Sequence, residues 1–186
     1  MVLLDDNDLD ALAAGEIVLR DGVLGAEAAS LVDEARALVA AAAPAGVGRG
    51  RRRDPAIRGD TIVWVDPPAL APALAIFEDL RRWLNRAYLD LREFDVQLAR
   101  YADGAGYARH RDAFAGAESR IVTAIYYLNP GWRAEHGGVL RAHARGGTRE
   151  IEPLFDRLIV FFSAAVEHEV LPAARERLAV TAWYRR

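Results

Sequence analysis

The chain has 186 residues, of which 52% are hydrophobic and 27% charged, and its formal net charge is −3. These values are typical of one globular domain and argue against a strongly basic nucleic-acid-binding protein. The chain has no cysteine, which excludes disulfide bonds and thiolate metal sites. The N-terminus lacks the pattern of a signal peptide, and no apolar run reaches the ~20 residues of a membrane span. We therefore expect a cytoplasmic monomer that binds neither membranes nor nucleic acid.

The first half of the chain carries mainly helical patterns. Apolar side chains recur at helical spacing, acidic residues stand at a helix start, and Pro44 ends one helix. A loop rich in glycine and arginine, residues 44–59, interrupts these patterns. We expect helices in residues 5–14, 25–43 and 72–91, and short strands in residues 16–24 and 60–65.

The second half consists of short strand patterns separated by Gly, Pro and Asn turns. We expect seven strands, in residues 94–101, 106–112, 119–129, 137–144, 156–163, 168–173 and 177–185. This number of short strands favours a compact β barrel or sandwich, and helices before strands favour an α+β fold. We predict one domain over residues 1–186, in which residues 1–93 give helical support with short strands and residues 94–186 form the core.

The stretch YARHRDAF places a histidine two residues before an aspartate, in a segment expected to be extended. In a helix, positions i and i+2 lie about 200° apart and cannot converge on one ion. In a strand they point to the same face. His110 and Asp112 could therefore bind one metal ion if a third ligand comes from elsewhere.

Three histidines are candidates for that third ligand. His136 and His143 lie in or beside turns, where a solvated histidine is the ordinary interpretation. His168 follows the most apolar strand and begins another, which is where a ligand at the mouth of a barrel would lie. Two histidines and one carboxylate suit non-haem Fe(II) with open coordination positions. A zinc site with the same ligands is left open by ligand type.

Arg177 begins the last strand, nine residues after His168. Alternation places Arg177, Thr181 and Trp183 on one face of that strand. An arginine in this position can bind a carboxylate with two hydrogen bonds, although an arginine at a strand end can also extend into solvent. In residues 119–129, Thr123 shares a face with Tyr127, so hydroxyl groups from two strands could line one cavity.

The sequence resembles the Fe(II)/2-oxoglutarate-dependent dioxygenases, specifically the prolyl hydroxylase domain subgroup that includes the animal oxygen-sensing enzymes and bacterial relatives. The resemblance rests on four features in order: the H-x-D motif at residues 110–112, the segment IYYLN, the distal His168, and Arg177 nine residues after it. Further matching segments are IRGDTIVWV, LARYADGAGYARHRDAF, GGVLR, IEPLFDRLIVFFS, HEVLPA and RLAVTAWY. The resemblance implies a double-stranded β-helix, or jelly-roll, core braced by N-terminal helices.

The resemblance also implies roles for individual residues. His110, Asp112 and His168 would be the iron ligands, and Arg177 would bind the distal carboxylate of 2-oxoglutarate with help from Tyr127. Other residues would contact the cosubstrate or line its pocket: Tyr101, Thr123, Leu140, Thr181 and Trp183. The cofactors would be Fe(II), 2-oxoglutarate and O₂, with ascorbate as a supporting reductant. The reaction would convert 2-oxoglutarate to succinate and CO₂ and hydroxylate a prolyl residue.

The expected substrate is a proline in an exposed loop of another protein, such as a translation factor. Residues 48–59 lie where the family has a mobile loop that closes over the substrate. We expect substrate contacts from Arg58 in the matching segment and from the lid residues Arg49, Arg51, Arg52 and Arg53. A solvated basic loop is the alternative interpretation, and nucleic-acid binding is disfavoured because stacking aromatic side chains are missing from it. Two loops look one residue shorter than in the animal enzymes, which leaves the substrate's identity open.

Two further hypotheses compete with a protein-directed enzyme. The same cofactors could serve a free amino acid or a small metabolite as substrate. Alternatively, the chain could be a catalytically silent jelly-roll binding module, for which a broken triad or a lost arginine would be expected. A zinc hydrolase is a weaker hypothesis, because its reaction would give no function to Arg177 and Tyr127.

Overall fold

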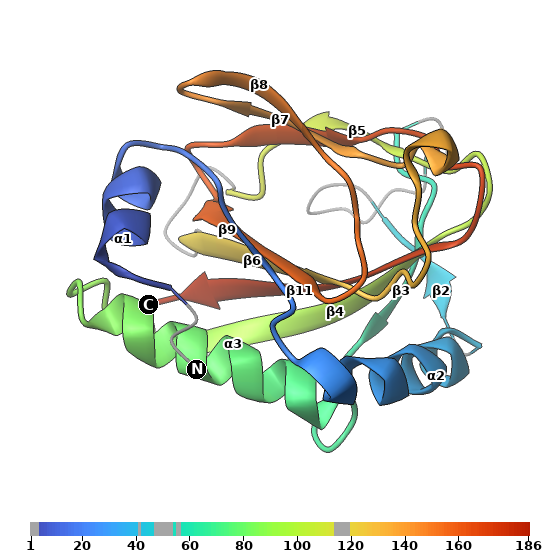
Figure 1. Ribbon diagram of the computed structural model, residues 1–186, viewed down its shortest axis with the longest axis horizontal. Helices are drawn as coiled ribbons and strands as arrows, with labels where there is room; N and C mark the ends of the chain where they lie inside the picture. The colour runs from blue at the N-terminus through green and yellow to red at the C-terminus, as the bar shows by residue number, and fades with distance from the viewer. Residues whose placement is uncertain (1–3, 41, 47–53, 55–56, 114–119) are drawn as a thin grey trace.

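The computed structural model describes residues 4–40, 42–46, 54, 57–113 and 120–186. Figure 1 shows two sheets stacked face to face, with two long helices beneath the larger one. The helices are α1 (Asp6–Ala13), α2 (Ala28–Val39) and α3 (Ala71–Asn85), with 3₁₀ turns η1 (Gly25–Glu27) and η2 (Ala134–His136). The strands are β1 (Val18–Asp21), β2 (Ala43–Pro44), β3 (Thr61–Trp64), β4 (Glu93–Tyr101), β5 (Tyr107–His110), β6 (Val122–Tyr127), β7 (Leu140–Ala144), β8 (Gly147–Ile151), β9 (Arg157–Phe162), β10 (Glu167–Val170) and β11 (Arg177–Arg185).

The larger sheet has seven strands in the order β1-β9-β6-β11-β4-β3-β2, and the smaller has four in the order β5-β10-β7-β8. All their pairings are antiparallel. From β4 onward, strands that follow one another in sequence alternate between the two sheets, except that β7 and β8 pair with each other in the smaller one. This arrangement confirms the expected α+β fold with a jelly-roll core. Three strands of the larger sheet, β1, β2 and β3, come from the N-terminal half.

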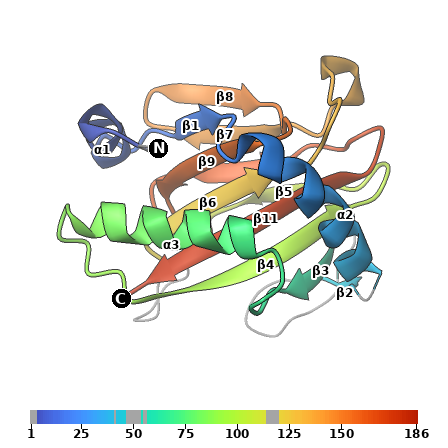
Figure 2. The same ribbon diagram turned by 60° about the horizontal axis from the view of Figure 1, so that its bottom comes forward.

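Helices α2 and α3 cover the outer face of the larger sheet, as Figure 2 shows. Alternate residues of β11 point toward these helices, and Tyr184 donates its hydroxyl hydrogen to the carbonyl of Phe77 in α3 over 2.9 Å. Leu80 and Leu84 of the same helix are fully buried in this core. Because side chains alternate along a strand, the opposite face of β11, which includes Arg177, is left to line the space between the sheets.

Two helices are shorter than the sequence suggested. One was expected over residues 25–43, but α2 follows the 3₁₀ turn η1 and ends at Val39, and residue 43 begins strand β2. The other was expected to reach residue 91, but α3 ends at Asn85. The Asn85 side chain accepts a hydrogen bond from the N–H of Leu91 and donates one to its carbonyl. The intervening loop contains two residues with left-handed backbone, Tyr88 and Asp90. Asn85 thus replaces helical hydrogen bonds with a side-chain bridge that closes the loop.

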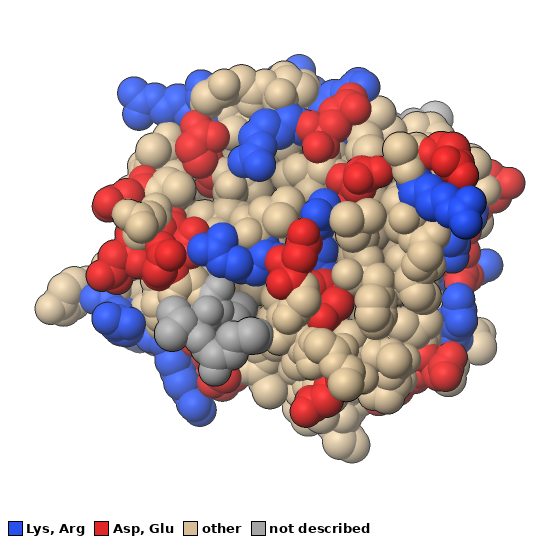
Figure 3. Space-filling model, in the orientation of Figure 1, with Lys and Arg blue, Asp and Glu red and all other residues tan. Residues whose placement is uncertain are grey.

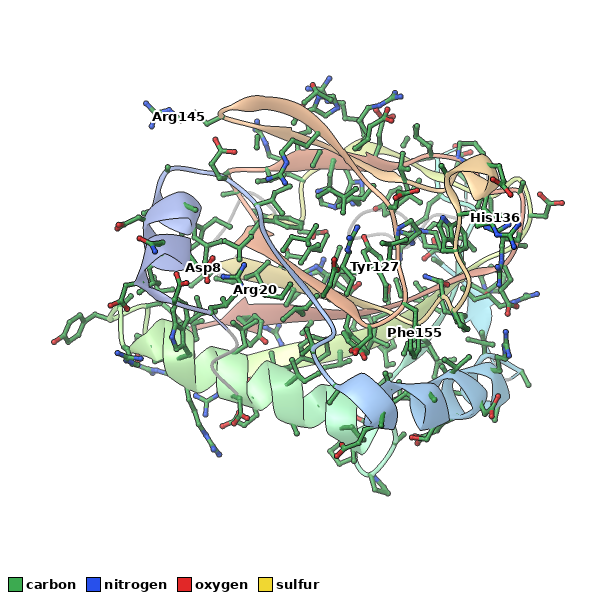
Figure 4. All side chains as sticks on the ribbon, viewed as in Figure 1. Asp8, Arg20, Tyr127, His136, Arg145 and Phe155 are labelled. Carbon is green, nitrogen blue, oxygen red and sulfur yellow. The ribbon has the colours of Figure 1, made fainter. Side chains whose placement is uncertain are left out.

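Ion pairs attach the N-terminal segment to the core. Asp5 caps α1 in a reciprocal capping box with Asp8, and Arg20 of β1 contacts the Asp8 carboxylate (Figure 4). Asp21, the next residue of β1, accepts two hydrogen bonds from Arg157 of β9, at 2.6 and 2.9 Å. These contacts reinforce the pairing of β1 with β9.

Acidic and basic side chains are interspersed over the face seen in Figure 3. Within the described ranges, no helix is long and apolar enough to cross a bilayer.

Candidate metal centre and cosubstrate pocket

Strands β5 and β10 bring two histidines together. His110 lies directly opposite His168 in the antiparallel pair, and their ring centroids are 4.4 Å apart. Asp112 follows β5, and its carboxylate oxygens lie 3.7 Å from His110 Nε2 and 3.8 Å from His168 Nε2. One donor atom from each residue lies within 4.8 Å of the others. The three predicted ligands therefore converge on one point, as required for binding a single ion.

Two backbone carbonyls orient the imidazole rings. His110 Nδ1 lies 2.8 Å from the carbonyl oxygen of Ala108, and His168 Nδ1 lies 3.4 Å from that of Val166. An imidazole whose Nδ1–H donates to a carbonyl leaves its Nε2 lone pair available to a metal. Burial, together with the neighbouring His168, lowers the pKa of His110 to about 4. Its neutral, metal-binding form therefore predominates at neutral pH.

Two buried hydroxyl groups hold the carboxylate of Asp112. Thr123 Oγ1 donates to Asp112 Oδ2 over 2.9 Å, and Ser163 Oγ lies 2.8 Å from Thr123 Oγ1. Burial alone would raise the pKa of Asp112, but His168, His110 and Arg120 outweigh that effect and lower it. The carboxylate is therefore ionised and fixed in orientation before any metal binds.

Arg177 is the largest fully buried side chain, with 1% of its surface exposed. Its Nε donates to the carbonyl of Gly138 over 2.9 Å, and its Nη2 lies 3.4 Å from the Tyr127 hydroxyl. Gly138 has φ of 63°, and a Cβ there would approach the Trp132 ring to 2.9 Å. No carboxylate of the described residues lies within ion-pair distance of Arg177. A buried cation without a counter-ion favours binding of an anion from outside.

Two tyrosines flank this guanidinium. The Arg177 Cζ atom lies 5.0 Å from the ring centroids of both Tyr101 and Tyr127. Figure 4 shows Tyr127 in the space between the two sheets. Burial raises the pKa of each tyrosine, so both keep their hydroxyl protons at neutral pH. The Tyr101 hydroxyl, which faces the cavity, can therefore donate a hydrogen bond to a bound carboxylate, and the Tyr127 hydroxyl can accept one from Arg177.

A cavity of about 820 Å³ joins the triad to Arg177. Tyr101, Leu140, Thr181 and Trp183 line it, as the resemblance implied. Two predicted pocket residues lie behind its wall instead. Thr123 is fully buried against Asp112, and Tyr127 acts through its contact with Arg177. The donor set and the unpaired guanidinium fit Fe(II) together with a dicarboxylate such as 2-oxoglutarate.

Arg58 lines the cavity, but its guanidinium already has protein partners. It forms two hydrogen bonds with the buried Asp60, at 2.7 and 2.9 Å, and one with Gln97 at 2.9 Å. It also lies over the ring of Tyr107, which stacks on His110 with centroids 3.7 Å apart. Arg58 thus braces a metal ligand, in addition to its predicted place at the substrate pocket.

Several residues of this site were not predicted from the sequence, and four predicted residues cannot be located in it. The predicted lid residues Arg49, Arg51, Arg52 and Arg53 lie outside the described residues. The missed cavity residues include Gln97, Tyr107 and Arg120, and Arg120 stacks on Trp183 at 3.7 Å. Alternation from Tyr101 along β4 could have identified Gln97. No comparable signal marks Arg120, which lies outside the strands.

Known proteins of one family match this chain in sequence and in structure. The 2OG-Fe(II) oxygenase superfamily model matches residues 96–185. A prolyl-4-hydroxylase from Pseudomonas putida has 38% identity and a TM-score of 0.86, covering 95% of this chain and 96% of that one. The chain belongs to the prolyl hydroxylase subgroup of the 2OG-Fe(II) oxygenases. Members of this superfamily use Fe(II), 2-oxoglutarate and O₂, and the His-Asp-His triad fits that iron.

Two animal relatives show the breadth of the match to this prolyl hydroxylase subgroup. Human prolyl hydroxylase EGLN3 is 36% identical over 141 residues, which are 69% of this chain and 59% of EGLN3. The chain thus spans less than two thirds of that relative. A prolyl hydroxylase from Trichoplax adhaerens, in complex with a hypoxia-inducible factor peptide fragment, has 28% identity and a TM-score of 0.84. That match covers 95% of this chain and 86% of the other.

Proposed function

We propose that the protein hydroxylates a prolyl residue of a protein substrate, using Fe(II), 2-oxoglutarate and O₂. One observation carries the cosubstrate assignment: Arg177, buried and without a carboxylate partner among the described residues, shares a cavity with three converging metal ligands. The relatives support the choice of proline, since each is named a prolyl hydroxylase. An intact triad and arginine also argue against a silent binding module.

The chain's own residues would position the reactants. His110, Asp112 and His168 would hold Fe(II), and Arg177 would bind one carboxylate of 2-oxoglutarate while Tyr127 supports the guanidinium. Fe(II) bound there supplies the redox chemistry by which 2-oxoglutarate is decarboxylated and one oxygen atom enters the substrate. Ile125, Leu140 and Trp183 give the cavity apolar walls that limit access of water.

The substrate is the finer part of the proposal. The Trichoplax relative was solved in complex with a peptide fragment of hypoxia inducible factor, which supports a segment of another protein as the substrate here. We further propose a cytoplasmic, monomeric enzyme in a bacterium, with a translation factor as one candidate substrate. Size-exclusion chromatography with light scattering tests the monomer, and mass spectrometry of hydroxyprolines in cells with and without the gene tests the substrate.

The cosubstrate site can be tested without turnover. Under anaerobic conditions, metal-free protein is loaded with Fe(II), 2-oxoglutarate is added, and the visible charge-transfer band of the chelate is recorded. The wild type should form the band, and His168→Ala should not. Arg177→Ala should need about 100-fold more 2-oxoglutarate, because a buried charged hydrogen-bonding partner is lost. Arg177→Lys is a matched control that keeps the positive charge but loses the two parallel N–H donors of the guanidinium. The 2-oxoglutarate concentration it needs should lie between those of the wild type and Arg177→Ala.

The outcomes separate the parts of the proposal. No band in wild-type protein with Fe(II) shown to be bound would contradict the oxygenase site. A normal band followed by oxidation of free amino acids, and of no proline-containing peptide, would contradict the protein substrate alone.

A further inference from the structure

A second cavity, of about 520 Å³, opens beside the candidate site, between β4 and α3. Most of its wall is apolar, with acidic side chains among the lining residues: Trp64, Val65, Asp66, Pro67, Leu74, Glu78, Phe94, Asp95 and Val96. Two of these residues, Trp64 and Asp95, also line the larger cavity that holds the triad. We call this second cavity the β4–α3 pocket. Trp64 and Asp95 thus form a wall common to both cavities.

The β4–α3 pocket lies where β4 has an open edge. Strand β3 pairs with β4 from Arg100 as far as Gln97, and a last hydrogen bond runs from the N–H of Val65 to the carbonyl of Val96 over 2.9 Å. Figure 2 shows β3 beside only part of β4, whose N-terminal portion extends beyond it. Among the described residues, none pairs with this edge at Phe94. Its backbone N–H and C=O can therefore pair with an added strand.

The open edge lies level with the metal ligands. Asp95 pairs with Trp183, and Trp183 pairs with Thr123, so these three residues form one row across the sheet. Thr123 contacts the metal ligand Asp112. A strand added beyond β4 would lie three strand spacings from Thr123, about 14 Å. An extended chain crosses that distance in about four or five residues.

The side chains around the open edge of β4 determine which type of side chain an added strand would place there. Trp64 stands at the boundary of the two cavities with 44% of its surface exposed, and its ring centroid lies 6.1 Å from that of Trp183. On the α3 side, Leu74 and Phe94 are only partly buried. Because side chains alternate, one residue of an added strand would point toward Leu74 and Phe94. An apolar side chain fits this position.

We propose that the β4–α3 pocket binds a flanking segment of the protein substrate as an added strand, about four or five residues from the target proline. This inference rests on the proposed function and adds a specificity site to it. The segment would pair its backbone with Phe94 and place a large apolar side chain between Leu74 and Phe94. Substrate selection would then depend on a residue remote from the reacting carbon.

A peptide library tests the inference directly. Each peptide has one fixed proline with about six randomised residues on either side, enough to span both cavities. After incubation with Fe(II)-loaded enzyme, 2-oxoglutarate and O₂, hydroxylated peptides are sequenced by mass spectrometry. We expect enrichment of Leu, Ile, Val, Met or Phe at the fourth or fifth position on one side of the hydroxyproline.

Leu74→Glu should reduce that enrichment about tenfold, because a carboxylate would then occupy the apolar wall. Leu38→Glu is the matched control, since Leu38 is also a partly buried helical leucine but lines neither cavity. Both variants should keep the 2-oxoglutarate charge-transfer band of the wild type, which shows that the fold and the metal site are intact.

A second measurement needs only the wild type. In the best hydroxylated peptide, each backbone nitrogen of the flanking segment is methylated in turn. Phe94 offers one outward-facing backbone carbonyl on this edge. KM should therefore rise about five- to tenfold at the single position whose N–H donates to that carbonyl, and much less at the positions directly before and after it.

The outcomes are distinguishable. Hydroxylation without a positional preference, or equal KM changes at adjacent positions of the flanking segment, would overturn the inference and leave the proposed function standing. Failure to hydroxylate any library peptide, with the charge-transfer band present, would overturn the peptide-substrate function and this inference with it.

Discussion

His110 and His168 are opposed residues of two neighbouring strands, and a metal bound between them would link β5 to β10. Strand β5 has only four residues and lies at the end of the smaller sheet. Its pairing with β10 is irregular between His168 and Val170. A strand held by so few backbone contacts gains most from a bond supplied by a shared ion.

Metal binding should therefore stabilise the folded protein. At a free metal concentration ~100 times Kd, the gain is about 2.7 kcal/mol. For a chain of this size that corresponds to a rise in Tm of about 5–10 °C. Calorimetry of the protein with Fe(II) under anaerobic conditions, then with excess chelator, measures it. His168→Ala should show no rise, and an equal rise in that variant would place the metal elsewhere.

Thr123 should control metal affinity without touching the metal. Thr123→Val removes the hydrogen bond to Asp112 while keeping the shape of the side chain, so the carboxylate loses its fixed orientation. We expect Fe(II) affinity to fall about 10- to 100-fold, measured by anaerobic titration. Ser163→Ala, which leaves the Thr123–Asp112 bond in place, should have a smaller effect. Equal affinities for Thr123→Val and wild type would contradict this role.

Asp156 should be a major contributor to stability. Its buried carboxylate accepts hydrogen bonds from the Tyr126 hydroxyl at 2.6 Å and from the N–H groups of Leu24 and Gly25 at 2.8 and 2.7 Å. Asp156→Ala leaves three donors without their acceptor and should lower the free energy of unfolding by about 3 kcal/mol. Tyr126→Phe removes one bond and should cost about 1 kcal/mol. Urea titrations of both variants measure the difference, and equal losses would contradict this account.

The ion pair between Asp21 and Arg157 should make part of the stability depend on pH. The hydrogen bond from Arg157 lowers the pKa of Asp21 below 3.8. A depressed carboxyl pKa stabilises the fold above the unfolded-state pKa, and this contribution is lost as the pH falls through the folded-state value.

Asp21→Asn should therefore cost less than about 1 kcal/mol near pH 7, because Asp21 is half exposed, and progressively less as the pH falls below 3.8. Urea titrations across this range measure the difference. Asp10→Asn removes an exposed charge that forms no ion pair within the described part of the chain, and serves as control. A constant cost down to pH 3 would refute the ion-pair explanation.

Two of the candidate metal ligands, His110 and Asp112, could be predicted because their spacing has a geometric meaning, whereas His168 was assigned by the family resemblance. Two side chains at i and i+2 share a face only in an extended segment. The short segments around His110, divided by turn residues, indicate a strand. Alternation along β11 likewise placed Arg177, Thr181 and Trp183 on the cavity side. Those arguments depend on local periodicity, which the sequence contains directly.

Features that depend on tertiary contacts could not be predicted. Strand β8 was missed because its first four residues are exposed and polar, so no apolar alternation marks it. Thr123 was expected in the pocket, since alternation gives the face of a residue but not its partner. The contact of Arg120 with Trp183 joins a loop to the last strand. The end of α3 depends on the bridge from Asn85 to Leu91.

Strand β1 pairs with β9, so Val18 lies beside Val160. During synthesis, β1 leaves the ribosome long before its partner exists, and such distant pairings form slowly. The larger sheet can acquire this edge only after residues 157–162 have emerged. His168 follows them in the chain, so the complete iron site also awaits this late stage. Iron loading should therefore follow the emergence of β10 from the ribosome, and it depends on the iron available at that point.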